Sequence, residues 1–266
     1  MPPTVREKKR FDIVRASNAR LQKKRVYVPM ESAVTLFVND KELITILCSP
    51  TKLEALAVGF LHTEGFLKSR KDVISLTVDQ GRGSVSVEIK NYNPLVEHLT
   101  RKRTLTTGCG RGTVFYSALD SLGVRPIRSR IKVTHQALQE LMRTLLLGSE
   151  TYRETGGIHS ALLGTKSGEG LVLCEDLGRH NAVDKVFGEC LLRDISPTNK
   201  VLVTSGRISS EMLIKALKKR VPVVVSRTSP TSLAVDLARQ VGLTLAGYAR
   251  GDKINVYTHT ERIIFA

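Results

Sequence analysis

Tryptophan is absent from the 266-residue sequence, and aromatic residues make up only 5% of it, so the core must be mainly aliphatic. No apolar run approaches the ~20 residues that span a bilayer. The N-terminus is basic and polar, without the apolar segment of a secretory signal. Hydrophobic residues at 41% and charged residues at 25% are ordinary for a globular protein. We therefore expect a cytoplasmic protein with no membrane partner and one large or two modest domains.

Closely spaced cysteines are also missing. The four cysteines are far apart and form neither a CxxC pair nor the Cys/His spacing of a structural zinc site. We expect free thiols and no bound metal, because a reducing cytosol disfavours disulfides. Cys48, Cys174 and Cys190 lie among apolar residues and are predicted to be inert core positions, whereas Cys109 lies in a loop-like stretch.

Acidic residues are scarce relative to basic ones. The 41 Lys and Arg residues against 25 Asp and Glu give a net charge of +16, and nine of the basic residues lie in residues 5–25 with only two acidic ones. Residues 1–25 are interpreted as a basic N-terminal arm or a solvated strand edge. Such an excess indicates an anionic partner, and nucleic acid is the first candidate. No aromatic interleaving or helix-turn-helix pattern accompanies this excess, so a phosphate-rich small ligand or an acidic protein partner fits it as well as nucleic acid does.

Residues 26–130 are predicted to form a smaller, β-rich α+β domain. Residues 50–61 have helical apolar spacing, and Gly65 is the expected end of that helix. Asn39 and Asp40 are typical of a hairpin turn. Strands are expected at 26–30, 33–38, 43–47, 73–78 and 84–89.

Residues 131–266 alternate between strand and helix patterns. Thr134 is a candidate N-cap for a helix that Gly148 ends. Further helices are expected at 181–188, 209–219 and 229–240, and strands at 160–163, 171–174, 201–204, 221–225, 243–248 and 254–259. This alternation favours a partly parallel α/β sheet and places a domain boundary near residue 130.

Cys109 stands between Gly108 and Gly110 in the stretch 104–115. The glycines let the backbone turn freely, and the nearby Arg103 and Arg111 favour the thiolate by lowering the thiol pKa. This local pattern fits a reactive thiol, but it fits a small residue in a glycine-rich turn equally well.

The densest polar cluster, residues 175–185, follows a predicted strand and enters a predicted helix. Arg179 and Lys185 are candidates to hold phosphates, and Asp176 or Asp184 to bind ribose hydroxyls or a guanine edge. His180 and Asn181 complete this candidate site. The alternative is a helix N-terminus carrying caps and ion pairs.

Three more polar turns suit an anion. Residues 204–211 place Ser205, Gly206 and Arg207 at a helix start, where free backbone N–H groups favour phosphate, although the order is not that of a Walker A loop. Ser226 and Thr228 repeat this chemistry. The turn between the last two predicted strands contributes Tyr248, Ala249, Arg250, Gly251, Asp252 and Lys253. Together these turns predict a nucleotide or dinucleotide pocket.

His159 follows the pair Gly156–Gly157 and precedes a predicted strand. It is a candidate acid/base or an orienter of the Cys109 thiol, and a core or capping histidine is the alternative.

Taken together, these stretches resemble the FdhD/NarQ family of formate dehydrogenase accessory sulfurtransferases. The resemblance rests on residues 156–161, 175–185, 204–212, 226–231 and 246–251 together with the Cys109 loop, and it spans about 25–265. It implies a cytidine-deaminase-like three-layer C-terminal domain and a cytoplasmic homodimer. It also implies that Cys109 carries persulfide sulfur from a cysteine desulfurase to the molybdenum (or tungsten) of the bis(molybdopterin guanine dinucleotide) molybdenum cofactor, destined for the formate dehydrogenase catalytic subunit. The cofactor would be a bound substrate, with GDP as its analogue.

The sequence departs from expected patterns at two points, and each departure limits the chemistry that the resemblance implies. Many family members carry CxxC in the sulfur loop, but Gly112 stands at the second position here, so Cys109 would act alone. Zinc deaminases need H-x-E with P-C-x-x-C, and the residues from His159 lack this signature, so no zinc is expected. A non-catalytic chaperone that binds and delivers the guanine dinucleotide cofactor is the alternative function, and a general nucleic-acid binder is a third.

Overall fold

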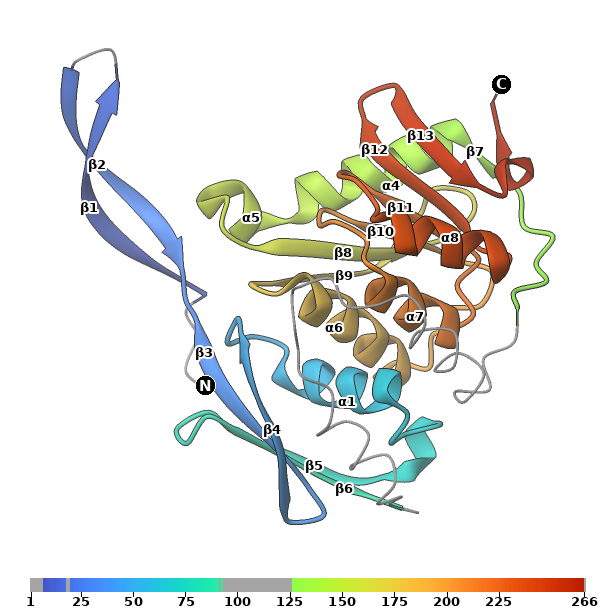
Figure 1. Ribbon diagram of the computed structural model, residues 1–266. Coiled ribbons are helices and arrows are strands. Elements are labelled where there is room, and N and C mark those ends of the chain that lie inside the picture. The colour runs from blue at the N-terminus through green and yellow to red at the C-terminus, as the bar shows by residue number, and fades with distance from the viewer. Residues whose placement is uncertain (1–6, 18–19, 91, 93–125, 266) are drawn as a thin grey trace.

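The computed structural model describes residues 7–17, 20–90, 92 and 126–265, and Cys109 lies outside them. These residues form a mixed α/β structure with a projecting hairpin, a small sheet carrying one helix, and a larger sheet between helices (Figure 1). None of the helices in this part of the chain is long and apolar enough to cross a membrane.

The basic N-terminal segment forms a hairpin of solvent-exposed strands, which agrees with the solvated strand edge considered for it and not with a flexible arm. Strand β1 (Lys8–Ser17) pairs antiparallel with β2 (Arg20–Pro29) over their full length, and the hairpin projects from the body (Figure 1). The sequence did not reveal it because most of its side chains are solvent-exposed, so its apolar residues follow no single-face alternation.

The small sheet has the order β4-β3-β6-β5 and confirms the strands predicted at 33–38, 43–47, 73–78 and 84–89, whereas the strand predicted at 26–30 is the end of β2 in the hairpin. Asn39 and Asp40 both have positive φ (48° and 62°), as a tight hairpin turn requires. Helix α1 (Leu53–Glu64) packs its aliphatic residues on the sheet and ends at Gly65, as predicted. The strands are β3 (Ser32–Val38), β4 (Lys41–Cys48), β5 (Val73–Asp79) and β6 (Ser84–Ile89).

The large sheet has the order β13-β12-β11-β10-β8-β9. Strands β10, β11 and β12 are parallel, and the other neighbouring pairs are antiparallel, so the sheet is partly parallel as predicted. The strands are β8 (His159–Gly164), β9 (Gly170–Asp176), β10 (Val201–Thr204), β11 (Val223–Ser226), β12 (Thr244–Arg250) and β13 (Lys253–Thr258).

Helices cover both faces of the large sheet. Helix α4 (His135–Gly148), capped by Thr134 as predicted, packs on one face, and α6 (Arg179–Leu192), α7 (Ser210–Lys218) and α8 (Ser232–Gln240) pack on the other. The result is three layers with an aliphatic core on each side of the sheet. Minor elements are the 3-10 turns η1 (Arg70–Asp72) and η2 (Thr260–Arg262), helix α5 (Glu150–Thr155), and the short pair β7 (Val133–Thr134) and β14 (Ile263–Ile264).

Helices α1 and α6 join the two sheets at a close crossing, which two glycines permit. A Cβ atom on Gly59 would lie 1.8 Å from the Asp184 carbonyl oxygen, and one on Gly188 would lie 1.8 Å from the Ala55 carbonyl oxygen. Only glycine fits either position, because real Cβ atoms do not approach backbone so closely. This crossing fixes the position of the amino end of α6, where the candidate site lies.

Candidate functional site

The predicted polar turns converge on one edge of the large sheet. Strands β9, β10, β11 and β12 run in one direction and β8 runs in the other, so their carboxyl ends lie beside the amino end of β8. Asp176, His159, Thr204 and Ser226 mark this edge. Open α/β sheets bind ligands at the carboxyl ends of their strands. We call this region the sheet edge.

Asp176 and Lys185 form a buried ion pair just beneath the sheet edge. The Lys185 Nζ lies 2.7 Å from Asp176 Oδ2, and both side chains are fully buried. Lys185 also donates to the Ser49 and Glu175 carbonyl oxygens at 3.2 and 3.3 Å. The Ser49 N–H donates to Asp176 at 3.1 Å, so the pair ties the large sheet to the chain after β4.

Asn181 belongs to the same junction. Its Nδ2 atom donates to the Leu47 carbonyl oxygen and to Asp176 Oδ1, both at 2.9 Å. The Gly178 N–H donates to that carboxylate at 2.8 Å, which closes the turn between β9 and α6. The amide of Asn181 is therefore occupied within the protein.

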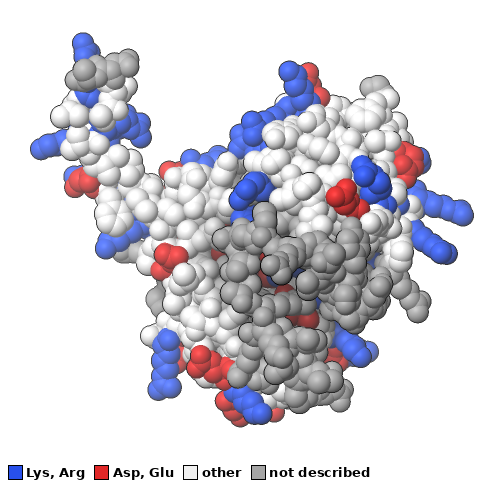
Figure 2. All heavy atoms as spheres, in the orientation of Figure 1, with Lys and Arg blue, Asp and Glu red and all other residues white. Residues whose placement is uncertain are grey.

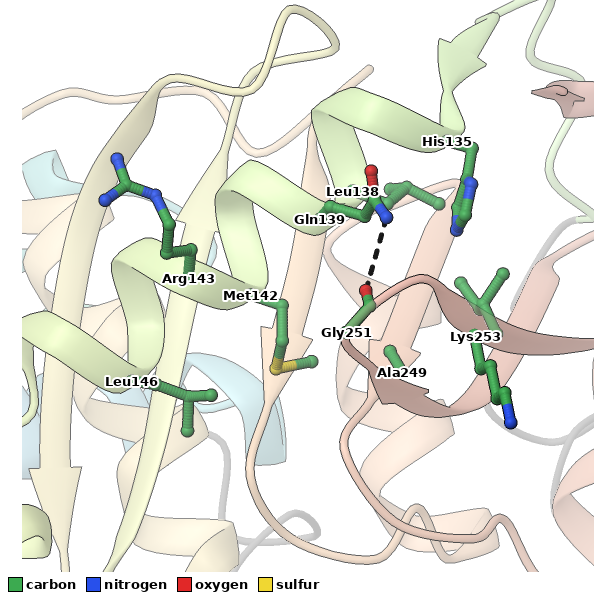
Figure 3. A pocket seen from close by; sticks show the side chains of 10 residues that line it. His135, Leu138, Gln139, Met142, Arg143, Leu146, Ala249, Gly251 and Lys253 are labelled. Carbon is green, nitrogen blue, oxygen red and sulfur yellow. Dashed lines mark hydrogen bonds between the residues drawn. The ribbon is translucent and has the colours of Figure 1, made fainter. Parts of the chain in front are cut away.

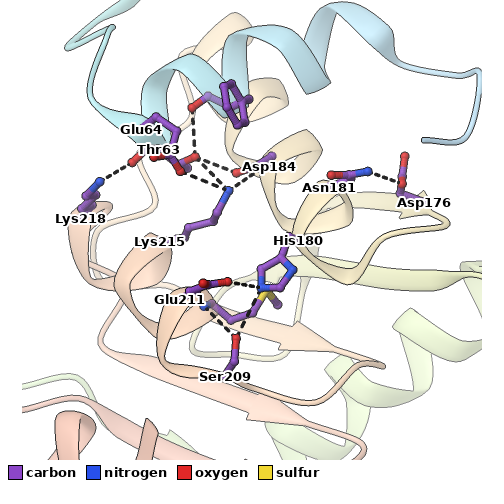
Figure 4. Close-up of polar contacts among 12 residues, drawn as sticks. Thr63, Glu64, Asp176, His180, Asn181, Asp184, Ser209, Glu211, Lys215 and Lys218 are labelled. Atoms are coloured by element: carbon purple, nitrogen blue, oxygen red, sulfur yellow. Dashed lines mark hydrogen bonds and ion pairs between the residues drawn. The ribbon is translucent and has the colours of Figure 1, made fainter. Parts of the chain in front are cut away.

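Asp184 lies one turn along α6 and forms a second buried pair. Its carboxylate accepts from Lys215 Nζ of α7 at 2.5 Å and from Thr63 Oγ1 of α1 at 2.7 Å (Figure 4). Burial raises the pKa of Asp184, while Lys215 and Thr63 lower it. Three helices thus meet around one carboxylate.

These contacts correspond to the alternative weighed for residues 175–185, a helix start carrying ion pairs. Asp184 and Lys185 were predicted to contact a ligand, but their side chains are buried and paired. A ligand would have to break those pairs to reach them. Their placement therefore gives both residues a stabilising role at the junction of the two sheets.

Arg179, His159 and Arg207 lie together at the sheet edge, and none of these three side chains is fully buried. Gly206 sits between them, since a Cβ there would lie 2.9 Å from Arg179 Cβ and 3.1 Å from His159 Nδ1. Burial and the neighbouring Arg179 lower the pKa of His159, and burial and Arg207 lower that of Arg179. The Arg179 Nε atom is buried and has no hydrogen-bond partner among the described residues. The sheet edge is thus electropositive, with an unsatisfied donor.

His180 faces α7 rather than this cation cluster. Its Nε2 atom lies 3.4 Å from both Ser209 Oγ and Glu211 Oε2 (Figure 4). Burial, with Lys215 and Arg179 nearby, lowers its pKa to about 3. The imidazole is therefore neutral at pH 7. In this state it can donate or accept a hydrogen bond, but it carries no positive charge to pair with an anion.

Ser205, Ser226 and Thr228 shape the neighbouring turns. Ser205 Oγ accepts from the Ser160 N–H at 2.9 Å, so this hydroxyl is already engaged. Ser226 Oγ donates to the Gly206 carbonyl oxygen at 2.7 Å and accepts from the Thr228 N–H at 2.9 Å. The bond from Ser226 to Gly206 links the turn at 204–211 with the turn at 226–231, so the two turns form one surface.

The residues from Tyr248 to Lys253 contribute to two different surfaces. Tyr248 is 42% exposed with a positive φ of 52°, and Arg250 lies 5.9 Å from its ring centroid. The Arg250 Nε donates to the Arg227 carbonyl oxygen at 3.1 Å, which ties this pair to the sheet edge. An exposed tyrosine ring beside an arginine is a suitable surface for stacking a planar base.

The other surface is a pocket of about 290 Å³ between α4 and the same turn (Figure 3). The Gln139 side chain donates to the Gly251 carbonyl oxygen at 3.2 Å and holds the turn against α4. The pocket is mainly apolar with a few polar groups, and Asp252 does not line it. Its lining is His135, Leu138, Gln139, Met142, Arg143, Leu146, Ala249, Gly251, Lys253 and Ile254.

Cys109 and its loop fall within residues 93–125, outside the described residues, so a meeting of Cys109 with His159 stays a prediction. Cys48, Cys174 and Cys190 are buried free thiols, as predicted. Burial raises their pKa values to about 12, 11 and 12. Within the described ranges, no group of three or more His, Cys, Asp and Glu residues is placed to hold a metal ion.

Sequence reasoning missed several residues of this region. Arg227 lies within the stretch 226–231 but was given no predicted role, and its Nη1 donates to the Tyr152 hydroxyl at 2.8 Å. Thr63 and Lys215 carried no signal, because they contact Asp184 from 121 and 31 residues away.

Comparison with known proteins agrees with the sequence motifs. The family model described as the FdhD/NarQ family matches residues 29–264, so most of the β1–β2 hairpin precedes the match. The chain is 37% identical over 252 residues to the sulfur carrier protein FdhD of Bacillus subtilis (strain 168), covering 95% of this chain and 96% of that one. It is 40% identical over 256 residues to the sulfur carrier protein FdhD of Staphylococcus aureus (strain MRSA252), covering 95% of each.

A solved structure shares the fold. A crystal structure described as that of a formate dehydrogenase accessory protein from Desulfotalea psychrophila superposes with a TM-score of 0.78 at 27% identity, covering 97% of this chain and 100% of that one. The matched range includes every polar turn of the sheet edge and the Cys109 loop. The chain belongs to the FdhD/NarQ family.

Proposed function

We propose that this protein is a sulfur carrier that serves formate dehydrogenase maturation. Cys109 accepts sulfur from the persulfide of a cysteine desulfurase and passes it to the bis(molybdopterin guanine dinucleotide) molybdenum cofactor, which is bound as a substrate. The names of the relatives, sulfur carrier proteins at 37–40% identity, support the class of activity. The description of the structural neighbour as a formate dehydrogenase accessory protein supports the client system.

The observation that supports the cofactor assignment is the cation cluster at the sheet edge. Arg179 lies beside Arg207 and His159, and its buried Nε has no hydrogen-bond partner in the part of the chain that the structure describes. Buried donors of this kind are normally hydrogen-bonded, and an arginine fork matches a phosphate oxygen pair. A pyrophosphate at this edge would satisfy Arg179 and neutralise the clustered positive charge.

The turn from Tyr248 to Lys253 supports a nucleoside beside those phosphates. Tyr248 with Arg250 offers a stacking surface on one side of the turn, and the pocket against α4 offers an apolar slot on the other. We infer that the guanine end of the cofactor occupies this turn, so GDP is a suitable analogue of the bound half.

The state of the cysteines supports Cys109 as the carrier. The pKa values of Cys48, Cys174 and Cys190 are raised to about 11 or 12, so these thiols are almost wholly protonated at neutral pH. The thiolate is the nucleophile in sulfur transfer. The Cys109 thiolate attacks the outer sulfur of the donor persulfide, the donor S–S bond breaks, and the donor leaves as a thiolate while Cys109 becomes the persulfide.

A non-catalytic chaperone is the second candidate, and Gly112 at the position of a second loop cysteine favours it. Complementation of a strain lacking the protein separates the two functions. The carrier predicts that Cys109→Ser abolishes formate dehydrogenase activity, while Cys174→Ser, a matched change of a buried thiol, retains it. Full activity with Cys109→Ser would favour the chaperone.

We infer a division into residues 26–130 and 131–266, with a cytidine-deaminase-like fold for the latter. Separate aliphatic cores on the small and large sheets support the division, and the three layers of the large sheet support the fold. Limited proteolysis of the full chain that cleaves near residue 130 and leaves two resistant fragments would agree with this division; cleavage within either core would contradict it.

We also propose a cytoplasmic homodimer that meets a cysteine desulfurase and the formate dehydrogenase catalytic subunit in turn, rather than nucleic acid. The client named in the structural neighbour's description supports the second partner. Sedimentation equilibrium of the purified chain tests the dimer, and a monomer mass across the micromolar range would contradict it.

A further inference from the structure

The β1–β2 hairpin has two chemically different faces. In an antiparallel pair, directly opposed residues share a face, and successive residues alternate between faces. One face carries Phe11 opposite Val26, with Lys9 opposite Val28 and Ile13 opposite Lys24 on either side. We call Phe11, Ile13, Val26 and Val28 the hairpin apolar face, and Lys9, Arg15 and Lys24 its basic rim.

The opposite face makes several contacts within the protein, although Val14 and Leu21 toward its tip are exposed. Lys8 pairs with Glu150 at 2.9 Å and with Glu154, Arg10 donates to the Tyr27 hydroxyl at 2.7 Å, and Arg25 donates to Asp12 at 2.9 Å. The Lys8 pairs tie the base of the hairpin to α5, whereas the other two contacts lie within the hairpin, which projects from the body (Figure 1). The hairpin apolar face therefore belongs to an element whose base is held by the body of the protein.

The hairpin apolar face is uncovered in the single chain. Phe11 is 44% exposed and Val28 40% exposed. A two-stranded hairpin alone is marginal in water, and clustered exposed apolar side chains mark interaction surfaces. Apolar residues at the centre with charged residues around them reproduce the usual composition of a protein–protein interface.

The positive charge of the hairpin favours an acidic partner. Residues 8–29 contain eight Lys and Arg residues and one acidic residue, Asp12, which Arg25 already pairs. Lys and Arg side chains extend from the projecting hairpin in Figure 2. A second copy of the chain carries the same excess and a net charge of +16, so like charges oppose hairpin-to-hairpin association. Nucleic acid would leave the aliphatic centre of the face without a matching surface, since such interfaces are polar and strongly cationic.

We propose that the hairpin apolar face docks an acidic protein partner. Apolar side chains of that partner cover Phe11 and its neighbours, and its carboxylates pair with Lys9, Arg15 and Lys24. The hairpin largely precedes the residues that define the family, and the docking does not depend on sulfur transfer or on the cofactor site.

Photo-crosslinking in cells that express the full chain tests this proposal. The variant Phe11→p-benzoylphenylalanine places the probe on the hairpin apolar face. The matched variant Val14→p-benzoylphenylalanine places it on the opposite face of the same strand, where Val14 is 60% exposed. The proposal predicts a protein adduct from position 11 that position 14 does not give, with the crosslinked peptide rich in Asp and Glu by mass spectrometry.

The partner identified by crosslinking is then purified and titrated against the full chain. This titration tests whether the charges around the hairpin apolar face contribute to binding. Lys24→Glu reverses a rim charge, and Lys23→Glu makes the same change one residue away on the opposite face. The proposal predicts that Lys24→Glu raises Kd at least about tenfold and that Lys23→Glu changes it less than about threefold. Unchanged melting temperatures show that both variants remain folded.

Four outcomes would overturn the proposal: adducts only to a second copy of the chain, adducts to nucleic acid, equal adducts from positions 11 and 14, or none from position 11. Equal effects of the two charge reversals would do so as well, because they would show long-range attraction rather than docking on one face.

Discussion

Asp184 of α6 and Lys215 of α7 form an ion pair of 2.5 Å, with Thr63 of α1 donating to the same carboxylate. The pair lies beneath the sheet edge where Arg179 and Arg207 gather, and both of its members are buried. It therefore holds the start of α6, which carries Arg179, in a fixed relation to both sheets.

Removing one charge of this pair should destabilise the protein. Asp184→Asn leaves the Lys215 ammonium buried, with Glu64 at 3.9 Å as its remaining carboxylate contact. Loss of one partner of a buried pair costs about 3 kcal/mol of unfolding free energy, measurable by urea denaturation. The exposed pair Asp236–Arg239, 3.7 Å apart, provides the control, and Asp236→Asn should cost less than about 1 kcal/mol. Equal losses would contradict the assigned role of Asp184.

The α1–α6 crossing should not tolerate a methyl group. In Gly188→Ala the new Cβ would lie 1.8 Å from the Ala55 carbonyl oxygen, so the helices must separate. We expect a loss of about 3 kcal/mol or more in unfolding free energy. Gly81→Ala is the control, because its Cβ would lie 3.4 Å from its nearest neighbour, the Asp79 side chain. A Gly188→Ala protein as stable as the control would show that the crossing is looser than described.

Acid should destabilise the fold through half-buried neutral histidines. Burial lowers the pKa of His180 to about 3, from an ordinary value of 6.5 that the unfolded chain regains. Below pH 6.5 the unfolded state binds the proton and the folded state does not, so stability present at higher pH is lost as the pH falls toward 3. Between pH 6.5 and 5 this amounts to about 2 kcal/mol.

The variant His180→Gln should remove that part of the pH dependence. Urea denaturation at pH 8 and pH 5 measures it as a smaller difference between the two pH values than in the wild type. His62, whose pKa burial lowers to about 4, continues to contribute in the variant. An unaltered difference would mean that His180 does not stay neutral in the folded protein.

GDP binding should depend on the cations of the sheet edge. Arg179→Ala removes a charge-assisted bond to phosphate and should raise the Kd for GDP at least about tenfold by calorimetry, a loss of about 1.4 kcal/mol. Arg193→Ala removes an exposed arginine at the other end of α6 and should leave the Kd within about twofold. If both variants bind GDP like the wild type, the phosphates are not at Arg179.

Structural elements whose ends are marked by nearby residues could be predicted from the sequence. Thr134 caps α4 with its side chain, and Gly65 ends α1 in the left-handed conformation, and both followed from residue chemistry alone. The alternation of strands and helices likewise predicted the partly parallel sheet.

What the sequence could not predict depends on distant partners. Asp184 and Lys185 resembled ligand contacts because their partners Thr63 and Ser49 lie 121 and 136 residues away. A polar cluster at a strand end is common to binding sites and to buried ion pairs, and only the three-dimensional partners distinguish them. The β1–β2 hairpin was missed because its exposed faces leave no single-face apolar pattern.

Sulfur loading of Cys109 is the direct test of the proposed carrier function. The purified protein is incubated with a cysteine desulfurase and cysteine, and its mass is then measured without reduction. We predict an increase of about 32 Da, one sulfur atom, that maps to the peptide containing Cys109 and disappears after reduction. Cys174→Ala should load like the wild type, and Cys109→Ala should not load. Equal loading of Cys109→Ala and the wild type would contradict the account.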